Sequence, residues 1–269
     1  MMGRTTPVLV ALGSFVAIEI LVRLIPLTPI AGWQRGLYWN YASHVLMIAV
    51  PVIALLLLRR KPAEYGLAPA WPRRELAVCA MVCPILIAVP ILGEALFGNL
   101  ALKHNTVLFV CSTILFQAVF AGFGEELLFR GFIQGELNRA FARRFRLFGV
   151  QCGWGLFIAA TLFAVAHLLN PFNPFLGRYE FSLVSMLTTG VAGMIFGLVR
   201  EHFGSILAAA LIHGAWDLGL TPFQQTAASS VGLGVAIFAV CWILGEVFSK
   251  PLPGEEAIES PHAAGLQSG

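Results

Sequence analysis

The sequence predicts an all-α polytopic membrane protein with about eight transmembrane helices that enclose a polar intramembrane cavity. Two observations lead to this fold class: 58% of the 269 residues are hydrophobic, with a mean hydropathy of +0.82, and only 12% are charged. Soluble domains carry about 25% charged residues, so this chain has too few charges to build a water-facing surface. The chain is also too apolar to remain disordered in water.

Eight continuous apolar runs are the expected transmembrane helices, because a spanning helix needs about 20 apolar residues. Membrane strands would show alternating hydrophobicity over about 10 residues, and these runs do not alternate. A helix also satisfies its own backbone hydrogen bonds in lipid. The seventh run is the shortest, which predicts a helix enclosed by protein. The runs are 8–27, 37–58, 76–96, 107–129, 148–169, 181–199, 206–220 and 231–248.

Basic residues are concentrated in every second loop, and this pattern predicts the orientation of the chain. Cytoplasmic loops of membrane proteins are enriched in Lys and Arg. Twelve basic residues fall on one side of the expected spans and three on the other. We therefore expect both termini in the cytoplasm and the chain in the plasma (inner) membrane. The twelve are Arg4, Arg59, Arg60, Lys61, Arg73, Arg74, Arg139, Arg143, Arg144, Arg146, Arg200 and Lys250, and the three are Arg35, Lys103 and Arg178.

The chain is expected to form one transmembrane domain over residues 1–249, with a catalytic-type core at about 105–220. Residues 250–269 are polar and rich in Pro and Gly, which predicts a disordered cytoplasmic tail. The net charge is only +3, and the basic residues lie beside hydrophobic runs. The lipid bilayer is therefore an expected partner, and nucleic acid is not.

Some ionisable residues inside the apolar runs have simple structural explanations. Each such residue costs on the order of 3 kcal/mol at the bilayer centre and marks a functional site by default. Glu19 and Arg23, however, can pair as i,i+4 neighbours on one helix. Glu94 and Glu246 lie near the ends of their runs and can reach the interface. His44 is a single histidine near the start of a helix.

Three groups of ionisable residues lack such an explanation. Left apart, their combined cost would rival a typical folding stability of about 5–15 kcal/mol. We therefore expect them to converge in a cavity that holds water. The groups are Glu125, Glu126 and Arg130 in the fourth run, His167 with Phe163 one turn before it in the fifth, and His213 and Asp217 in the seventh.

Helix geometry assigns roles to these residues. With 3.6 residues per turn, Glu126 and Arg130 share a face and are the expected ion pair. Glu125 points about 100° away and is free to act as a general base. His213 and Asp217 are also i,i+4 neighbours, so the carboxylate can orient the imidazole or contact a substrate. A base, histidines and an orienting carboxylate around water indicate hydrolysis.

At these positions the sequence resembles the CPBP family of intramembrane endopeptidases. That family includes the type II CAAX prenyl endopeptidases and bacterial proteins linked to bacteriocin processing and self-immunity. Its three motifs occur here in order, with 42 residues from Glu125 to His167 and 46 from His167 to His213. They are Glu-Glu-x-x-x-Arg at Glu125, Glu126 and Arg130, Phe-x-x-x-His at Phe163 and His167, and His-x-x-x-Asn or Asp at His213 and Asp217.

The resemblance implies a CAAX-protease-like hydrolase whose substrate is a membrane-associated protein or peptide. Glu125 and His167 would activate water, and His213 would face the carbonyl oxygen. Asp217 stands where the CAAX-type enzymes have Asn. An ionised Asp cannot donate a hydrogen bond, so Asp217 must be protonated, orient His213 or bind a cation. We expect the scissile bond to enter from the cytoplasmic half, because the Glu-Glu motif ends at the basic loop that starts near Arg130.

Three alternatives stay open at this point. A divalent metal such as zinc could bind to Glu125, His167 and His213, since two histidines and a glutamate form a known catalytic zinc set. The sequence has no His-Glu-x-x-His zinc motif, and no cofactor is assigned. The chain could instead be a proton-coupled transporter whose buried groups form a relay. It could also be a catalytically silent scaffold or immunity protein of the same family.

Overall fold

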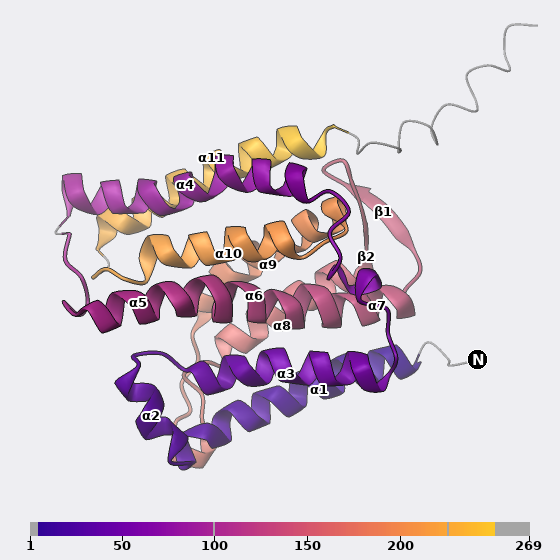
Figure 1. The fold of residues 1–269 in the computed structure, drawn as a ribbon, viewed down its shortest axis with the longest axis horizontal. Coiled ribbons are helices and arrows are strands. Elements are labelled where there is room, and N and C mark those ends of the chain that lie inside the picture. The colour runs from indigo at the N-terminus through magenta and orange to yellow at the C-terminus, as the bar shows by residue number, and fades with distance from the viewer. Residues whose placement is uncertain (1–4, 99, 225, 251–269) are drawn as a thin grey trace, which may run out of the picture.

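A computed structural model describes residues 5–98, 100–224 and 226–250 as a layered bundle of helices lying along a common direction (Figure 1). The elements are α1 (Thr5–Leu24), η1 (Ile25–Leu27), α2 (Ile30–Gly36), α3 (Tyr41–Leu57), η2 (Pro62–Tyr65), α4 (Pro72–Phe97), α5 (Val107–Leu115), η3 (Phe116–Ala121), α6 (Gly122–Glu126), η4 (Leu127–Ile133), α7 (Gln134–Ala140), β1 (Arg144–Leu147), β2 (Val150–Gly153), α8 (Trp154–Leu168), η5 (Pro174–Leu176), α9 (Leu183–Phe203), α10 (Leu207–Leu220) and α11 (Ala227–Phe248). The tail expected at 250–269 lies, apart from Lys250, outside these residues.

The described residues form a helical membrane protein, but eight complete spans are not confirmed. Five helices are long and apolar enough to cross a membrane, and the number rises to six if α2 and α3, bent by 114°, count as one span. Helices α8 and α10 have only 15 and 14 residues. At 1.5 Å per residue they are roughly 21–23 Å long, whereas the hydrocarbon core is about 30 Å thick.

The fifth apolar run is not helical over its whole length, which corrects the expectation of a helix over 148–169. Strand β2 pairs with β1 in an antiparallel hairpin, and helix α8 begins only at Trp154. Phe148 and Gly149 have φ values of 50° and 86°. Two successive residues with positive φ form the tight turn that hairpins prefer, and they stop a right-handed helix. A few β residues therefore stand in a fold predicted to be all-α.

Helix α10 is enclosed by protein, as its short apolar run predicted. It packs against α4, α6, η3 and α9, and most of its side chains between Ala208 and Ala215 are buried. Its first turn is capped by the fully buried Glu75 of α4, whose Oε2 accepts a hydrogen bond of 3.1 Å from the Ala208 amide. A carboxylate at a helix N-terminus satisfies a free amide and complements the helix dipole. Helix α10 is therefore held firmly behind the site.

Several charged residues in the apolar runs had simple structural explanations, and the structure agrees with some of these explanations but not with all. Glu19 and Arg23 form the expected ion pair at 2.7 Å, and Glu246 is exposed. Glu94, by contrast, does not reach the interface: it is buried and caps α11 by accepting hydrogen bonds from Thr226 and Ser229. A glutamate near the end of one helix can thus satisfy the free amides at the start of another.

The α3–α4 loop is tied to α7 by a buried group around Glu136. The Tyr65 hydroxyl donates to Glu136, and the Arg60 guanidinium donates to the same carboxylate at 3.0 and 3.2 Å. Both Tyr65 and Glu136 are fully buried. Burial, and then the hydrogen bond to Glu136, raises the pKa of Tyr65, so the phenol stays protonated and remains a donor.

The Tyr65→Phe variant is expected to lower the free energy of unfolding by about 1.5–3 kcal/mol, the usual contribution of a hydrogen bond to a charged group. The thermal unfolding midpoint in detergent measures this loss. Tyr38→Phe is the matched control, because the Tyr38 hydroxyl makes only an exposed 3.3 Å contact with Thr106. Equal midpoints for the two variants would contradict a stabilising role for the Tyr65 hydroxyl.

Candidate functional site

The Glu-Glu motif lies in the middle of a continuous helix that extends from Val107 to Ala140. Glu125 and Glu126 are the last residues of the short helix α6, and π-helical segments flank α6 on both sides, η3 before it and η4 after it. Single π turns inside α-helices are frequent at functional sites because they change the direction of side chains. Both carboxylates are buried in the bundle, with α10 on one side of α6 and α3 on the other (Figure 1).

Glu126 connects two of the three motifs. Its Oε1 accepts a hydrogen bond of 2.7 Å from Arg130, and the same oxygen lies 2.9 Å from Nδ1 of His213. The predicted Glu126–Arg130 ion pair is therefore present, and both of its side chains are fully buried. Because a carboxylate oxygen accepts, His213 carries its hydrogen on Nδ1, and Nε2 is the free ring atom.

Three phenylalanine rings surround the Arg130 guanidinium. Its central carbon lies 4.2 Å from the ring centroid of Phe163, 5.3 Å from that of Phe196 and 5.9 Å from that of Phe129. Cations are attracted to the faces of aromatic rings, most strongly where water is excluded. On α9, a Cβ at Gly193 would lie 3.1 Å from Nη2 of Arg130. The phenylalanine of the second motif thus supports the arginine of the first.

Close backbone contacts bring α10 to the Glu-Glu motif. A Cβ at Gly122 would lie 2.7 Å from the carbonyl oxygen of Ala210, and one at Gly214 would lie 3.1 Å from Cα of Ala118. Larger residues at either glycine would separate the two helices. These two glycines therefore allow His213 to reach Glu126.

The free Nε2 of His213 lies between two further carboxylates. It is 3.8 Å from Oε2 of Glu125 and 3.7 Å from Oδ2 of Asp217. Asp217 is the more exposed of the two, with a side chain 26% accessible. His213 and Asp217 lie close together, as predicted, and Nε2 of His213 faces Glu125.

His44 is a member of the site that the sequence reasoning missed. Its Nε2 lies 3.0 Å from Oε1 of Glu125, and its ring is buried in the first turn of α3. The sequence interpretation treated His44 as an isolated residue with no functional role. A signal was available, since any imidazole inside an apolar membrane segment is costly without a partner. Its partner, 81 positions away, could not be read from local spacing.

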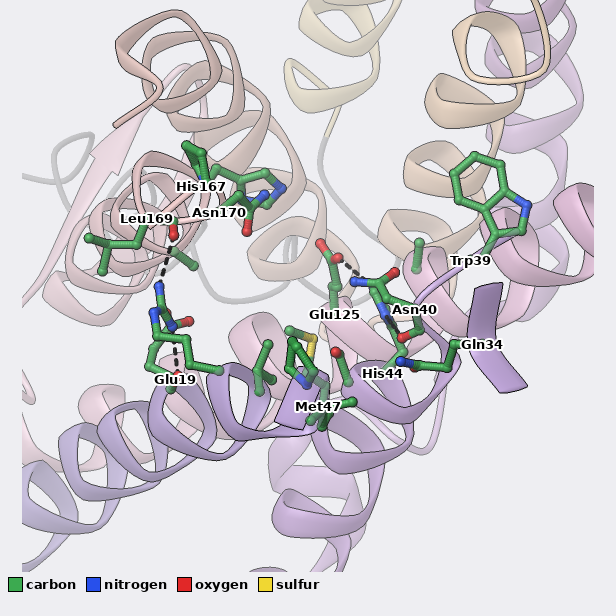
Figure 2. A pocket seen from close by; sticks show the side chains of 18 of the residues that line it. Glu19, Gln34, Trp39, Asn40, His44, Met47, Glu125, His167, Leu169 and Asn170 are labelled. Carbon is green, nitrogen blue, oxygen red and sulfur yellow. Dashed lines mark hydrogen bonds and ion pairs between the residues drawn. The ribbon is translucent and has the colours of Figure 1, made fainter. Parts of the chain in front are cut away.

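His167 lies in the last turn of α8, on another wall of the cavity from Glu125 (Figure 2). Its Nδ1 is 2.9 Å from the carbonyl oxygen of Phe163, one turn before it. A carbonyl only accepts, so Nδ1 carries the hydrogen and Nε2 of the neutral ring can accept a proton. Among the described residues, no hydrogen bond or ion pair joins His167 to Glu125 directly.

A cavity of about 800 Å³ reaches these groups, a volume typical of small-molecule and peptide sites. Glu125, His44 and His167 line it (Figure 2). Asp217 lines it as well, whereas Glu126, Arg130 and His213 are buried and do not line it. The structure also corrects the reason for expecting entry near Arg130. The helix does not end there but continues to Ala140, and Arg130 is fully buried.

Within residues 5–98, 100–224 and 226–250, no three His, Cys, Asp or Glu side chains converge as a group that could hold a metal ion. Glu125, His167 and His213, the zinc set considered from the sequence, therefore do not fit a bound metal in this arrangement.

Comparison with known proteins agrees with the three motifs. Residues 106–219 match the family model described as type II CAAX prenyl endopeptidase, Rce1-like. No curated protein and no solved structure matches the chain significantly. The matched segment starts just before α5 and ends within α10, so it includes all three motifs but not His44. The described chain is a helical membrane protein, and its segment 106–219 is similar to the Rce1-like type II CAAX prenyl endopeptidases.

Proposed function

We propose that this protein is an intramembrane endopeptidase that hydrolyses a peptide bond of a membrane-associated protein or peptide, with Glu125 as the general base. The observation that carries the proposal is the environment of the Glu125 carboxylate. It lines the cavity, its Oε1 is held by His44, and its Oε2 has no hydrogen-bond partner among the described residues. One oxygen is thus fixed, and the other is buried without a hydrogen-bond partner, so it is the atom left to bind a catalytic water.

In the proposed reaction, Oε2 of Glu125 takes a proton from water while the water oxygen bonds to the scissile carbonyl carbon. The carbonyl oxygen becomes an oxyanion, and the C–N bond then breaks as the proton taken up by Glu125 passes to the amine nitrogen, which restores the Glu125 carboxylate. His213 would act in its doubly protonated form, in which Nδ1–H is held by Glu126 and Nε2–H donates to the oxyanion. Fixed donors of this kind stabilise developing charge without reorganisation.

His167 would complete the water site from the opposite wall. With its Nδ1 hydrogen bonded to the carbonyl of Phe163, its Nε2 is the atom available to water or to the leaving amine. Asp217 would orient His213, because an ionised carboxylate accepts hydrogen bonds and cannot donate one to an oxyanion. This role is consistent with its 3.7 Å distance from Nε2 of His213.

The proposal is tested by comparing the membrane proteomes of cells that express the wild type and the Glu125→Gln variant. We expect at least one precursor to accumulate in the variant and its shorter product to disappear. Glu246→Gln is the control for the loss of one carboxylate, because Glu246 is exposed on α11. Identical peptide profiles for the wild type and Glu125→Gln would contradict the proposed function.

His44 is proposed as a positioning residue that holds Glu125. His44→Leu removes one hydrogen bond to a charged group, worth about 1.5–3 kcal/mol, so kcat is expected to fall about 10- to 150-fold with KM unchanged. His44→Gln keeps an N–H donor and should retain more activity than His44→Leu. The kinetics are measured on the precursor identified above. Equal losses in both variants, or a change in KM alone, would contradict the positioning role.

A further inference from the structure

The cavity lies at one end of the bundle, and this placement bears on which substrates can reach Glu125. Its walls come from the ends of α1, α8 and α10, the start of α3, helix α2 and the connection between α8 and α9. In Figure 1 this is the end marked by α2, opposite the end that carries the N-terminal part of α1 and the hairpin β1–β2. The central helix also lines the cavity, through η3, α6 and Phe129 of η4, and the other segments lie on the α2 side of the site.

Among the described residues, the cavity opens at the α2 end. The cavity residues in α2 and in the α8–α9 connection, such as Arg35, Asn170 and Arg178, are exposed. Toward the other end, the helix that carries Glu125 continues with Arg130 and Phe132, both fully buried. The protein is therefore closed on the Arg130 side of Glu125, which we call the closed end, and open on the α2 side, which we call the open end.

The basic residues are gathered at the closed end. The loop between α3 and α4 and the segment from Arg139 to Arg146 face that way, as do Arg200 and Lys250. Of the fourteen basic residues that flank the expected spans and lie within the described residues, only Arg35, Lys103 and Arg178 belong to the open end. Because short cytoplasmic loops attract Lys and Arg, the closed end faces the cytoplasm.

We propose that the cavity is entered from the non-cytoplasmic side of the membrane, and that the bond cleaved belongs to a polypeptide segment exposed on that side. This inference rests on the proposed function. It names the substrate class as an exported peptide or the extracytoplasmic segment of a membrane protein, not a cytoplasmic C-terminal tail. The expectation of cytoplasmic entry depended on the helix ending near Arg130, and it does not end there.

The depth of the site also limits the form of the substrate. Glu125 is 18 residues from the open end of its helix at Val107 and 15 from Ala140, so it lies roughly 27 Å and 22 Å from the two ends. His167, by contrast, is in the last turn of α8. The part of the Glu125 helix that lines the cavity begins at Phe116, and a folded domain does not fit into a cavity of about 800 Å³. The substrate must enter as an extended or locally unfolded segment.

The entry side is tested by thiol labelling in sealed membrane vesicles of known orientation. Cys83, Cys111 and Cys241 are replaced by Ala, and the buried Cys79 and Cys152 are kept to protect folding. Leu176→Cys then reports on the cavity mouth and Lys61→Cys on the closed end, since both side chains are exposed. A membrane-impermeant maleimide should label Leu176→Cys only in right-side-out vesicles and Lys61→Cys only in inside-out vesicles.

The opposite labelling pattern would overturn the entry side and leave the proposed function intact, because labelling needs no activity and can be repeated in Glu125→Gln. The wild type should cut the precursor that accumulates in Glu125→Gln membranes, and the bond that it cuts should lie on the non-cytoplasmic side. A cut bond mapped to the cytoplasmic side would overturn the inference but support proteolysis. The expected labelling without any accumulated precursor would overturn the proposed function, and the substrate class with it.

Discussion

Purified Glu125→Gln is expected to cleave the accumulated precursor about 10²- to 10⁴-fold more slowly than the wild type, the usual contribution of general acid–base catalysis. Glutamine has the shape of glutamate but cannot take a proton from water. Its amide oxygen can still accept the hydrogen bond from His44, which joins Oε1 of Glu125 at 3.0 Å. The fold should therefore be retained while the chemical step is lost.

Single-turnover rates in detergent or proteoliposomes measure the expected loss, with the thermal unfolding midpoint recorded for the same samples. Glu246→Gln serves as the matched control, since the same change is made at an exposed position on α11. It should cleave at the wild-type rate. Wild-type turnover by Glu125→Gln would remove Glu125 as the base, whereas a large fall in its unfolding midpoint would point to a structural role.

The parts of the site that depend on local helix geometry could be predicted from the sequence. Glu126 and Arg130 are one turn apart on a single helix, and the structure joins them at 2.7 Å. Glu19 and Arg23 follow the same rule. Backbone geometry alone places such neighbours on one face, so no knowledge of the tertiary fold is needed.

Partners from distant helices could not be predicted in the same way. His44 and Glu125 meet only because α3 packs against α6. The phenylalanines around Arg130 come from η4, α8 and α9, and this packing explains how a cation can be fully buried inside a bundle. From the sequence alone, Arg130 was interpreted as the start of a basic loop, which placed the end of the helix incorrectly.

The structure confirms only five or six of the eight expected spans among the described residues, because hydrophobicity reports burial as well as contact with lipid. Residues 150–153 are apolar enough to extend the fifth run, yet they form a strand whose residues Val150 and Cys152 are buried by packing. Helix α10 is apolar because protein surrounds it. The short length of the seventh run therefore correctly predicted that protein encloses α10. The length of an apolar run does not by itself show whether its helix crosses the membrane.

Replacing Arg130 with methionine is expected to have the largest effect on stability. The ion pair with Glu126 is fully buried, and removing one partner of such a pair costs about 3–5 kcal/mol because the remaining charge is unpaired. A typical protein has only about 5–15 kcal/mol of stability. Arg130→Met should therefore express poorly or unfold at a much lower temperature in the same detergent.

The double variant Glu126→Gln/Arg130→Met separates the two possible causes of that loss. If the unpaired Glu126 carboxylate is the cause, neutralising it should restore most of the unfolding midpoint. Cleavage should remain impaired, because Nδ1 of His213 loses the carboxylate that it contacts at 2.9 Å. A double variant no more stable than Arg130→Met would instead assign the loss to the contacts between the guanidinium and the phenylalanine rings. Stability recovered without activity would show that the Glu126–Arg130 pair serves to position His213.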